Sequence, residues 1–530
     1  MRELYLTNLF DILLTGGAQT PERVALFHGG ENVTYRDLLA RTVRVSQALE
    51  KLPRGSRVGL LCENSITYVI GFFAVSAAGQ VVVPLDTSLK PDSLLRILND
   101  CGAAGLIVSK RFASTLTKLT GENSPIELII SEKPVEFENQ PPETLSVAEL
   151  LDGTDAPSVP DTIQTRLKQL ASSKTVKHDD LKDCSDDLAA IFYTSGSTGA
   201  AKGVMLSHRN LVSNTVATVE YLNLTADDSI IVILPLYYIY GNSLMLTHLL
   251  CGGRMVIENR FAYPQVVMQT MIEQEVTGFS GVPSNFMILL NNAGFNSSGV
   301  PHLRYLTQAG GAMPPNIIGN LLDAFPNREI FIMYGQTEAS PRISYLPPEL
   351  LKTKIGSVGV PVPGVTLAIH DEQGQQLPQG ELGEVVVSGP NVMLGYFNQP
   401  EEQGQVLKNG RLFTGDLGRI ESDGLLWLVS RQKEIIKVGG NRVSTREVEE
   451  CLLTHPHITE AAVVGVADDI LGEALKAVVV LGQGQTIETQ TIQKHCQAQL
   501  GANKVPKHVV FMDSLPRYQS GKVNKQALTD

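Results

Sequence analysis

The stretch most suited to chemistry spans residues 193–204 and reads Tyr-Thr-Ser-Gly-Ser-Thr-Gly-Ala-Ala-Lys-Gly-Val. Its glycines allow backbone N–H groups to approach an anion, its hydroxyls can donate hydrogen bonds, and Lys202 supplies positive charge. A Walker P-loop is excluded because that motif has a glycine immediately before its lysine, where this chain has Ala201. A flexible Gly/Ser linker is the other alternative, but apolar segments at 188–192 and 204–206 flank the loop. The stretch therefore predicts a phosphate-binding loop that follows a strand.

Four later blocks place charged residues at short spacings: Tyr334-Gly-Gln-Thr-Glu338, Thr414-Gly-Asp416, Arg431-Gln-Lys-Glu-Ile-Ile-Lys437 and Pro516-Arg-Tyr-Gln-Ser-Gly-Lys522. Together with the loop, and with Val33-Thr-Tyr-Arg-Asp-Leu38 near the start, they resemble the adenylate-forming superfamily in their order. That superfamily contains acyl-CoA synthetases, adenylation domains of peptide synthetases and luciferases. The resemblance covers residues 193–522. It implies a large α/β N-terminal domain over 1–432 and a small, mobile α+β lid domain over 433–530.

The resemblance assigns most of these blocks to ATP. Asp416 would accept the two ribose hydroxyls, and Arg431 would contact ribose or phosphate. Glu338 would hold Mg²⁺, Thr337 would contact the α-phosphate, and Tyr334 would stack near adenine. The residues implied for the β- and γ-phosphates are Thr194, Ser195, Gly196, Ser197, Thr198, Gly199 and Lys202. The residues implied for the adenine-binding strand, where a plain tight turn is the alternative, are Gly310, Gly311 and Ala312.

Three lysines of the C-terminal part receive roles from the same resemblance. Lys522 would bridge the carboxylate and the α-phosphate during adenylation, where its charge offsets negative charge in the transition state. Lys437 matches a lysine that acts in the thioester-forming or alternative conformation. Lys433 falls at the hinge between the two domains. For Lys433 and Lys437, an ordinary solvated lysine is the alternative.

The acid substrate is less well defined by the sequence. The implied pocket consists of Tyr237, Tyr238, Ile239, Tyr240, Gly281, Thr307, Ala309, Met333, Pro341 and Arg342. Amino-acid adenylation domains usually have an Asp where this chain has Ile239, which weakens an amino-acid substrate. Tyr237, Tyr238, Tyr240 and Met333 could crowd the cavity and disfavour a long alkyl chain, although core packing would also explain the tyrosines. If the tyrosine segment is extended, its side chains must alternate between two faces.

The activity that follows is an ATP-dependent, AMP-forming ligase. A carboxylate is a poor electrophile, and conversion to an acyl-adenylate provides AMP as a leaving group for attack by a thiol. We expect a small carboxylic acid, with L-proline as one guess, to be transferred to the phosphopantetheine thiol of a separate carrier protein. The alternative is an acyl-CoA or aryl-CoA synthetase that uses free CoA. Two other functional classes are also open: a catalytically inactive binding protein and a luciferase-like monooxygenase. The presence of Lys202, Glu338 and Asp416 counts against an inactive binding protein.

Composition places the chain among multidomain cytoplasmic proteins. Its 530 residues exceed one ordinary core, and 43% hydrophobic with 18% charged residues is typical of a well-packed globular protein. A formal charge of −12 argues against a nucleic-acid partner. The six cysteines form no CxxC pair, so neither a zinc site nor a disulfide framework is indicated. No signal peptide is recognisable, and no apolar run reaches the roughly 18 residues that a membrane helix needs.

The elements that must position these residues can be read from hydrophobic periodicity. Short apolar runs at 57–62, 81–84, 105–109 and 126–130 alternate with helical patterns such as 68–76, which predicts α/β units around a largely parallel sheet. The polar segment 151–187 predicts a surface connection with some helix. After about residue 432, an amphipathic helix over 445–453 and strands at 461–466 and 474–481 predict a compact α+β domain.

Overall fold

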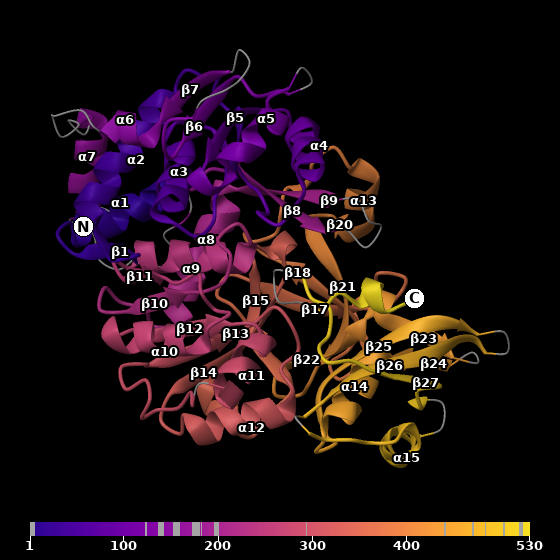
Figure 1. Cartoon of the computed structure of the whole chain (residues 1–530). Helices are drawn as coiled ribbons and strands as arrows, with labels where there is room; N and C mark the ends of the chain where they lie inside the picture. Colours follow the sequence, from indigo (N-terminus) through magenta and orange to yellow (C-terminus); the bar gives the residue numbers. More distant parts are fainter. Residues whose placement is uncertain are drawn as a thin grey trace.

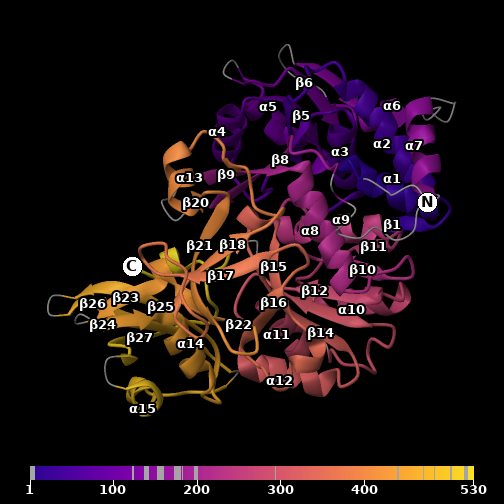
Figure 2. The same cartoon turned by 180° about the vertical axis from the view of Figure 1, so that it is seen from behind.

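The computed structural model describes residues 6–121, 124–135, 142–151, 160–171, 181, 183–195, 201–292, 294–438, 441–468, 471–482, 484–501, 504–518 and 523–529. Three sheets organise the chain (Figures 1 and 2). The indigo N-terminal part and the magenta to salmon middle part lie against each other. The gold C-terminal part lies beside the antiparallel strands of the middle part. In the described part of the chain, none of the helices combines the length and the apolar character that a membrane crossing requires.

The first sheet is largely parallel, as the apolar runs predicted. Six of its strands run parallel and in the order β8 (Leu188–Ser195), β4 (Val81–Pro84), β3 (Arg57–Leu61), β5 (Ala103–Val108), β6 (Leu128–Ser131) and β7 (Glu143–Ser146). Beyond β8 the sheet continues antiparallel with β9 (Ala201–Ser207) and β19 (Gly395–Tyr396). Its helices are α2 (Tyr35–Leu49), α3 (Ile66–Ala77), α4 (Pro91–Cys101), α5 (Leu116–Leu119) and α6 (Val147–Leu151). Helix α7 (Asp161–Ala171) confirms the helix expected in the polar connection.

The second sheet has a parallel half and an antiparallel half. The parallel half runs β1 (Val24–His28), β11 (Arg254–Ile257), β10 (Ser229–Val232), β12 (Gly278–Gly281), β13 (Tyr305–Gln308) and β14 (Glu329–Gly335), with β2 (Glu31–Thr34) antiparallel at its edge. Helices α8 (His208–Tyr221), α10 (Pro264–Glu273), α11 (Pro283–Asn292) and α12 (Pro315–Ala324) alternate with these strands. The antiparallel half is β15 (Arg342–Leu346), β16 (Ser357–Pro361), β22 (Leu426–Arg431), β21 (Arg411–Ile420), β18 (Gly383–Ser388) and β17 (Thr366–His370), with β20 (Leu407–Lys408) beside β21 and α13 (Pro400–Val406) before it.

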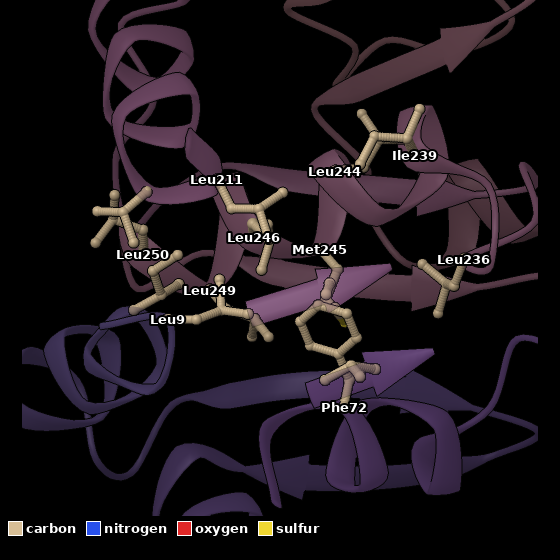
Figure 3. Packing of buried hydrophobic residues seen from close by; sticks show 14 of the residues in the cluster. Leu9, Phe72, Leu211, Leu236, Ile239, Leu244, Met245, Leu246, Leu249 and Leu250 are labelled. Atoms are coloured by element: carbon tan, nitrogen blue, oxygen red, sulfur yellow. The ribbon is translucent and has the colours of Figure 1, made fainter. Parts of the chain in front are cut away.

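The two large parts share one core at α9 (Ile239–Leu250). Every residue of this helix is buried, which fits a sequence that is apolar on most sides. Figure 3 shows Met245 of α9 directly above Phe72 of α3, and Leu249 next to Leu9, which precedes α1 (Phe10–Gln19). Phe72 itself packs edge-on against Phe73, with ring centroids 5.6 Å apart. The pocket-forming elements of the middle part therefore rest on a rigid N-terminal support.

The third sheet confirms the α+β pattern predicted for the C-terminal part. Its order is β24 (Asn441–Ser444), β23 (Ile435–Val438), β26 (Gly472–Leu481) and β25 (Ile458–Asp468), with β27 (His508–Phe511) parallel to β26. Helix α14 (Thr445–Leu453) coincides with the predicted amphipathic helix. The Ser444 side chain caps its N-terminus by accepting the Glu447 N–H, and α15 (Thr489–Leu500) packs beside it. All six cysteines are free thiols, as expected.

A half-buried histidine, His208 at the start of α8, contacts the residue before α1 and is expected to make stability depend on pH. The Leu9 N–H donates to His208 Nδ1 at 3.0 Å, and burial lowers the pKa of His208 from 6.5 to about 4. Below pH 6.5 the unfolded chain takes up a proton that the folded chain refuses, so stability falls from there toward pH 4. His208→Asn keeps a side-chain oxygen for the Leu9 N–H but cannot titrate. Between pH 6.5 and pH 4 we expect the free energy of unfolding of the wild type to fall more steeply than that of His208→Asn, by about 1 kcal/mol per pH unit. The measurement is thermal unfolding of both proteins at several pH values. An equal pH dependence in the two proteins would contradict the assignment to His208.

Candidate active site

The carboxyl ends of three parallel strands bring part of the implied acid pocket together. Strands β12 and β13 pair with Gly281 opposite Gln308, and β13 pairs with β14 with Gln308 opposite Ile332. Gly281, Thr307, Ala309 and Met333 are therefore neighbours at one edge of the sheet, where open α/β sheets bind ligands. All four are buried. The sequence placed these residues in one pocket, and the strand register gives the physical reason for their proximity.

The phosphate loop connects two antiparallel strands. In the hairpin of β8 and β9, Thr194 lies opposite Lys202 and Ser195 opposite Ala201. The Lys202 side chain is only 15% exposed, with Nζ 3.9 Å from Glu402 Oε1 and 5.3 Å from the centroid of the Tyr396 ring. The Ser195 side chain and the loop residues Gly196, Ser197, Thr198 and Gly199 lie outside the described residues. The hairpin explains why no helix follows the loop, in contrast to a P-loop.

Tyr396 joins the phosphate strand to Glu338, and the sequence reasoning missed it. Its hydroxyl donates to Glu338 Oε1 at 2.7 Å, while its ring faces Lys202. Burial and the Glu338 carboxylate raise the pKa of Tyr396, so the hydroxyl stays protonated and can donate. The position arises because β19 pairs with β9, with Tyr396 opposite Val204. The pair Gly395-Tyr396 is too short to give a pattern from which this contact could have been found.

Lys202, Tyr396 and Glu338 form a first cluster, and a second cluster surrounds Asp416. The Tyr334 hydroxyl donates to Asp416 Oδ2 at 2.6 Å, and Arg431 Nε donates to Oδ1 at 3.0 Å. Strand pairing enforces this arrangement, because Asp416 of β21 lies opposite Arg431 of β22. The Asp416 side chain is 7% exposed, whereas Arg431 is 55% exposed. Burial and the Asp416 carboxylate raise the pKa of Tyr334 well above its usual value. Both oxygens of the carboxylate are thus held in fixed directions.

The short segment after β14 connects the two clusters. Tyr334 belongs to β14, and Glu338 follows it in a single turn at Thr337–Ala339, with Thr337 buried. Gly335 allows the chain to fold back, since a Cβ there would lie 1.9 Å from the Pro341 carbonyl oxygen. At the implied adenine strand, Gly310 has φ +83°, a backbone conformation that favours glycine, while Gly311 and Ala312 are exposed beside it.

The tyrosine segment is a turn into a helix and not an extended strand, so the conditional expectation of alternating side chains does not apply. Tyr238 caps α9, and Ile239 and Tyr240 belong to its first turn. Tyr240 is buried, and its hydroxyl donates to the Thr307 carbonyl oxygen at 3.1 Å. Tyr237 and Tyr238 are half-buried. Tyr240 is thus a core residue, as the alternative of core packing predicts. Its hydrogen bond to Thr307 places its hydroxyl at the carboxyl end of β13.

Arg342 is buried directly behind this tyrosine. It begins β15 opposite Gly335, is 2% exposed, and places its Cζ 4.4 Å from the centroid of the Tyr240 ring. Its backbone exchanges two hydrogen bonds with the Asn214 side chain, at 3.1 and 2.8 Å. Burial raises the pKa of Tyr240, and the Arg342 charge opposes that rise. Arg342 therefore lies against Tyr240, and its assignment with the adjacent Pro341 to the acid pocket stays a prediction.

Of the three lysines implied in the C-terminal part, Lys437 has a described side chain. Lys437 lies on β23 and is exposed, and its backbone N–H donates to Glu473 Oε2 at 3.0 Å. Lys433 lies in the turn Gln432–Glu434 between β22 and β23, at the junction of the second and third sheets; its side chain lies outside the described residues. Lys522 also lies outside them.

The carboxylate of Glu338 fits the Mg²⁺ role that the resemblance implies. In the described part of the chain, no group of three His, Cys, Asp or Glu side chains could hold a metal by itself. Mg²⁺ usually binds one or two carboxylates together with substrate phosphates, and keeps several waters. Glu338 is half-buried, near Lys202, with one oxygen fixed by Tyr396. A single oriented carboxylate near Lys202 is compatible with a Mg²⁺ ion that takes its other ligands from phosphates and water.

Comparisons with known proteins agree with this geometry. Residues 15–397 match the family model described as "AMP-binding enzyme", and residues 447–522 match "AMP-binding enzyme C-terminal domain". A long-chain-fatty-acid–CoA ligase of Escherichia coli O6:H1 is 30% identical, covering 99% of this chain and 94% of that protein. A feruloyl-CoA synthase of Amycolatopsis is 32% identical, covering 96% and 95%. The crystal structure of ATP-bound MatB from Rhodopseudomonas palustris superposes with a TM-score of 0.82 at 29% identity, covering 98% of each chain. The chain belongs to the AMP-binding enzymes of the adenylate-forming superfamily, and within them to the AMP-forming acyl- and aryl-CoA ligases.

Proposed function

We propose that this enzyme adenylates a carboxylic acid smaller than a long-chain fatty acid and transfers the acyl group to the thiol of free CoA. The observation that carries the proposal is the convergence of two clusters on the segment 334–338. Asp416 and Arg431 reach it through Tyr334, and Lys202 reaches it through Tyr396 and Glu338. One segment thereby aligns a ribose acceptor with a phosphate-binding cation.

The acceptor in this proposal differs from the carrier protein favoured by the sequence alone. The fatty-acid and feruloyl relatives are both named as ligases or synthases of CoA thioesters, which supports the CoA alternative. Nothing in the comparisons supports a carrier protein or proline. The two relatives are named for different acids, so their names do not identify the acid that this chain uses. Crowding by Tyr240 and Met333 at the strand ends supports a smaller acid.

The chemistry divides into two displacements. A carboxylate oxygen attacks the α-phosphorus of ATP and pyrophosphate leaves; then the thiol sulfur attacks the acyl carbon, loses its proton, and AMP leaves. Asp416 orients the ribose, and Lys202 with the loop residues neutralises the leaving pyrophosphate. Mg²⁺ held by Glu338 would supply further positive charge to the phosphates. The proposed hinge at Lys433 would exchange Lys522 for Lys437 between the two steps.

A two-stage assay tests this function. Acid-dependent exchange of labelled pyrophosphate into ATP should occur with short aliphatic or aryl acids, and addition of CoA should yield the acyl-CoA and AMP in equal amounts. Proline and a phosphopantetheinylated carrier protein serve as the matched alternatives in the same assays. Exchange without thioester formation on CoA, together with loading of the carrier protein, would overturn the proposed acceptor. Preferred use of long-chain fatty acids would overturn the proposed size limit.

A further inference from the structure

A buried guanidinium at the acid pocket lacks a counter-ion. Arg342 is 2% exposed, and among the described residues no carboxylate lies within ion-pair distance of it. Its Nε has no hydrogen-bond partner in the described part of the chain. The charge faces the ring of Tyr240, and the same charge opposes the burial that raises the pKa of Tyr221 to about 12. Aromatic rings and a neutral hydroxyl therefore form its nearest surroundings.

This situation is unusual both in general and within this chain. An arginine is almost never fully buried unless it is paired, because desolvation of an uncompensated charge costs several kcal/mol. Two less buried arginines of this chain do have carboxylate partners: Arg166 pairs with Asp11, and Arg304 pairs with Asp228 and Glu329. A cation–π contact recovers only about 2 kcal/mol even when it is desolvated. The described residues around Arg342 thus leave its charge unbalanced.

The position of Arg342 is also fixed in advance. Its N–H donates to Asn214 Oδ1, and its carbonyl oxygen accepts from Asn214 Nδ2 and from Asn391 Nδ2 at 3.1 Å. The Tyr240 ring that carries the guanidinium is itself anchored to Thr307, whose hydroxyl lies 2.6 Å from Ser280 Oγ. These contacts place the side chain at the carboxyl ends of β12 and β13, where the acid is proposed to bind. A preorganised guanidinium of this kind is suited to bidentate binding of a carboxylate.

We propose that Arg342 binds a second carboxylate of the substrate, so that this ligase acts on dicarboxylic acids. The inference rests on the proposed function, because it assigns the chemical class of acid that enters the same pocket. One carboxylate of the substrate is adenylated, and the other supplies the missing counter-ion of Arg342. A substrate with an ammonium group, such as proline, would add a second positive charge beside the first, which the same argument disfavours.

The test compares matched acids that differ only in the second carboxylate. Pyrophosphate exchange is measured with succinate against butyrate, glutarate against pentanoate, and phthalate against benzoate. For at least one pair, we expect kcat/KM to favour the dicarboxylic acid by about 10²-fold or more, since leaving a buried charge unpaired is costly. Arg342→Met should remove that preference, because it should raise KM much more for the dicarboxylic acid than for the matched monocarboxylic acid.

Arg304 provides the matched control, because its Cζ also lies over a tyrosine ring, 4.7 Å from the centroid of Tyr305, but it is ion-paired. Arg304→Lys and Arg342→Lys are compared for melting temperature and for the acid preference, and only the Arg342 variant should change the preference. The lysine variant also gives the readout if Arg342→Met does not fold. Exchange that is equal for both acids of every pair, or an equal loss for both acids in the Arg342 variants, would overturn the inference alone. No exchange with any acid would overturn the proposed function as well.

Discussion

Replacing Lys522 by alanine is expected to reduce acid-dependent pyrophosphate exchange by about 10²-fold or more, the usual scale for loss of one preorganised charge contact. The segment that carries this lysine is anchored on both sides. Arg517 pairs with Val523 in an isolated bridge, and the Asn524 N–H donates to the Pro516 carbonyl oxygen at 2.7 Å. Leu515 packs into the small core beside β25 and β26. The described residues on both sides of 519–522 therefore belong to the C-terminal part of the chain.

Thioester formation, the second half-reaction, distinguishes a role of Lys522 in adenylation from a purely structural role. Transfer from a supplied acyl-adenylate to CoA should largely survive in Lys522→Ala, because the α-phosphate has then already reacted. Lys494→Ala removes an exposed lysine from α15 of the same domain and should leave both half-reactions unchanged. Equal losses in exchange and in transfer would show that Lys522 does not act specifically in adenylation.

Asp416→Ala is expected to lower kcat/KM for ATP by about 10²- to 10³-fold, since hydrogen bonds to a charged group contribute about 1.5–3 kcal/mol each. The substitution removes the proposed ribose acceptor. It also leaves the buried Tyr334 hydroxyl without the carboxylate at 2.6 Å and Arg431 without its ion pair. Both effects act on the nucleotide, so the loss should appear mainly as weaker ATP binding, measurable by titration with a non-hydrolysable ATP analogue.

Two further variants show how much of the loss of ATP affinity comes from the carboxylate itself. Tyr334→Phe removes only the hydroxyl and should cost less than Asp416→Ala, because the carboxylate remains available to the ribose. Asp423→Ala removes an exposed aspartate that pairs with Lys354 on the turn after β21, and serves as the control for loss of a carboxylate. Unchanged ATP affinity in Asp416→Ala would remove the carboxylate from the nucleotide site and make it a purely structural partner of Arg431.

Local pattern allowed the sequence to predict many elements. The strand at 81–84 and the helix at 445–453 agree with the structure because a short apolar run, a helical period and an N-terminal hydroxyl are properties of neighbouring residues. The motif blocks predicted the family, and the structure brings Tyr334, Asp416 and Arg431 into contact. The roles of the loop residues 196–199 and of Lys433, Lys437 and Lys522 stay predictions.

Tertiary pairing decided what local pattern could not. Tyr396 reaches Glu338 because β19 pairs with β9, about 190 residues earlier in the chain, and no short-range signal encodes that pairing. The antiparallel half of the second sheet brings Asp416 opposite Arg431 for the same reason. The chemical meaning of Arg342 also depends on the fold: as a sequence letter it is an ordinary pocket candidate. Only the packing of Tyr240 and the absence of a nearby carboxylate among the described residues make it a buried, uncompensated charge. Sequence thus determined the reaction class through residues close together in the chain, whereas burial and charge balance, which depend on distant neighbours, were decided by the tertiary structure.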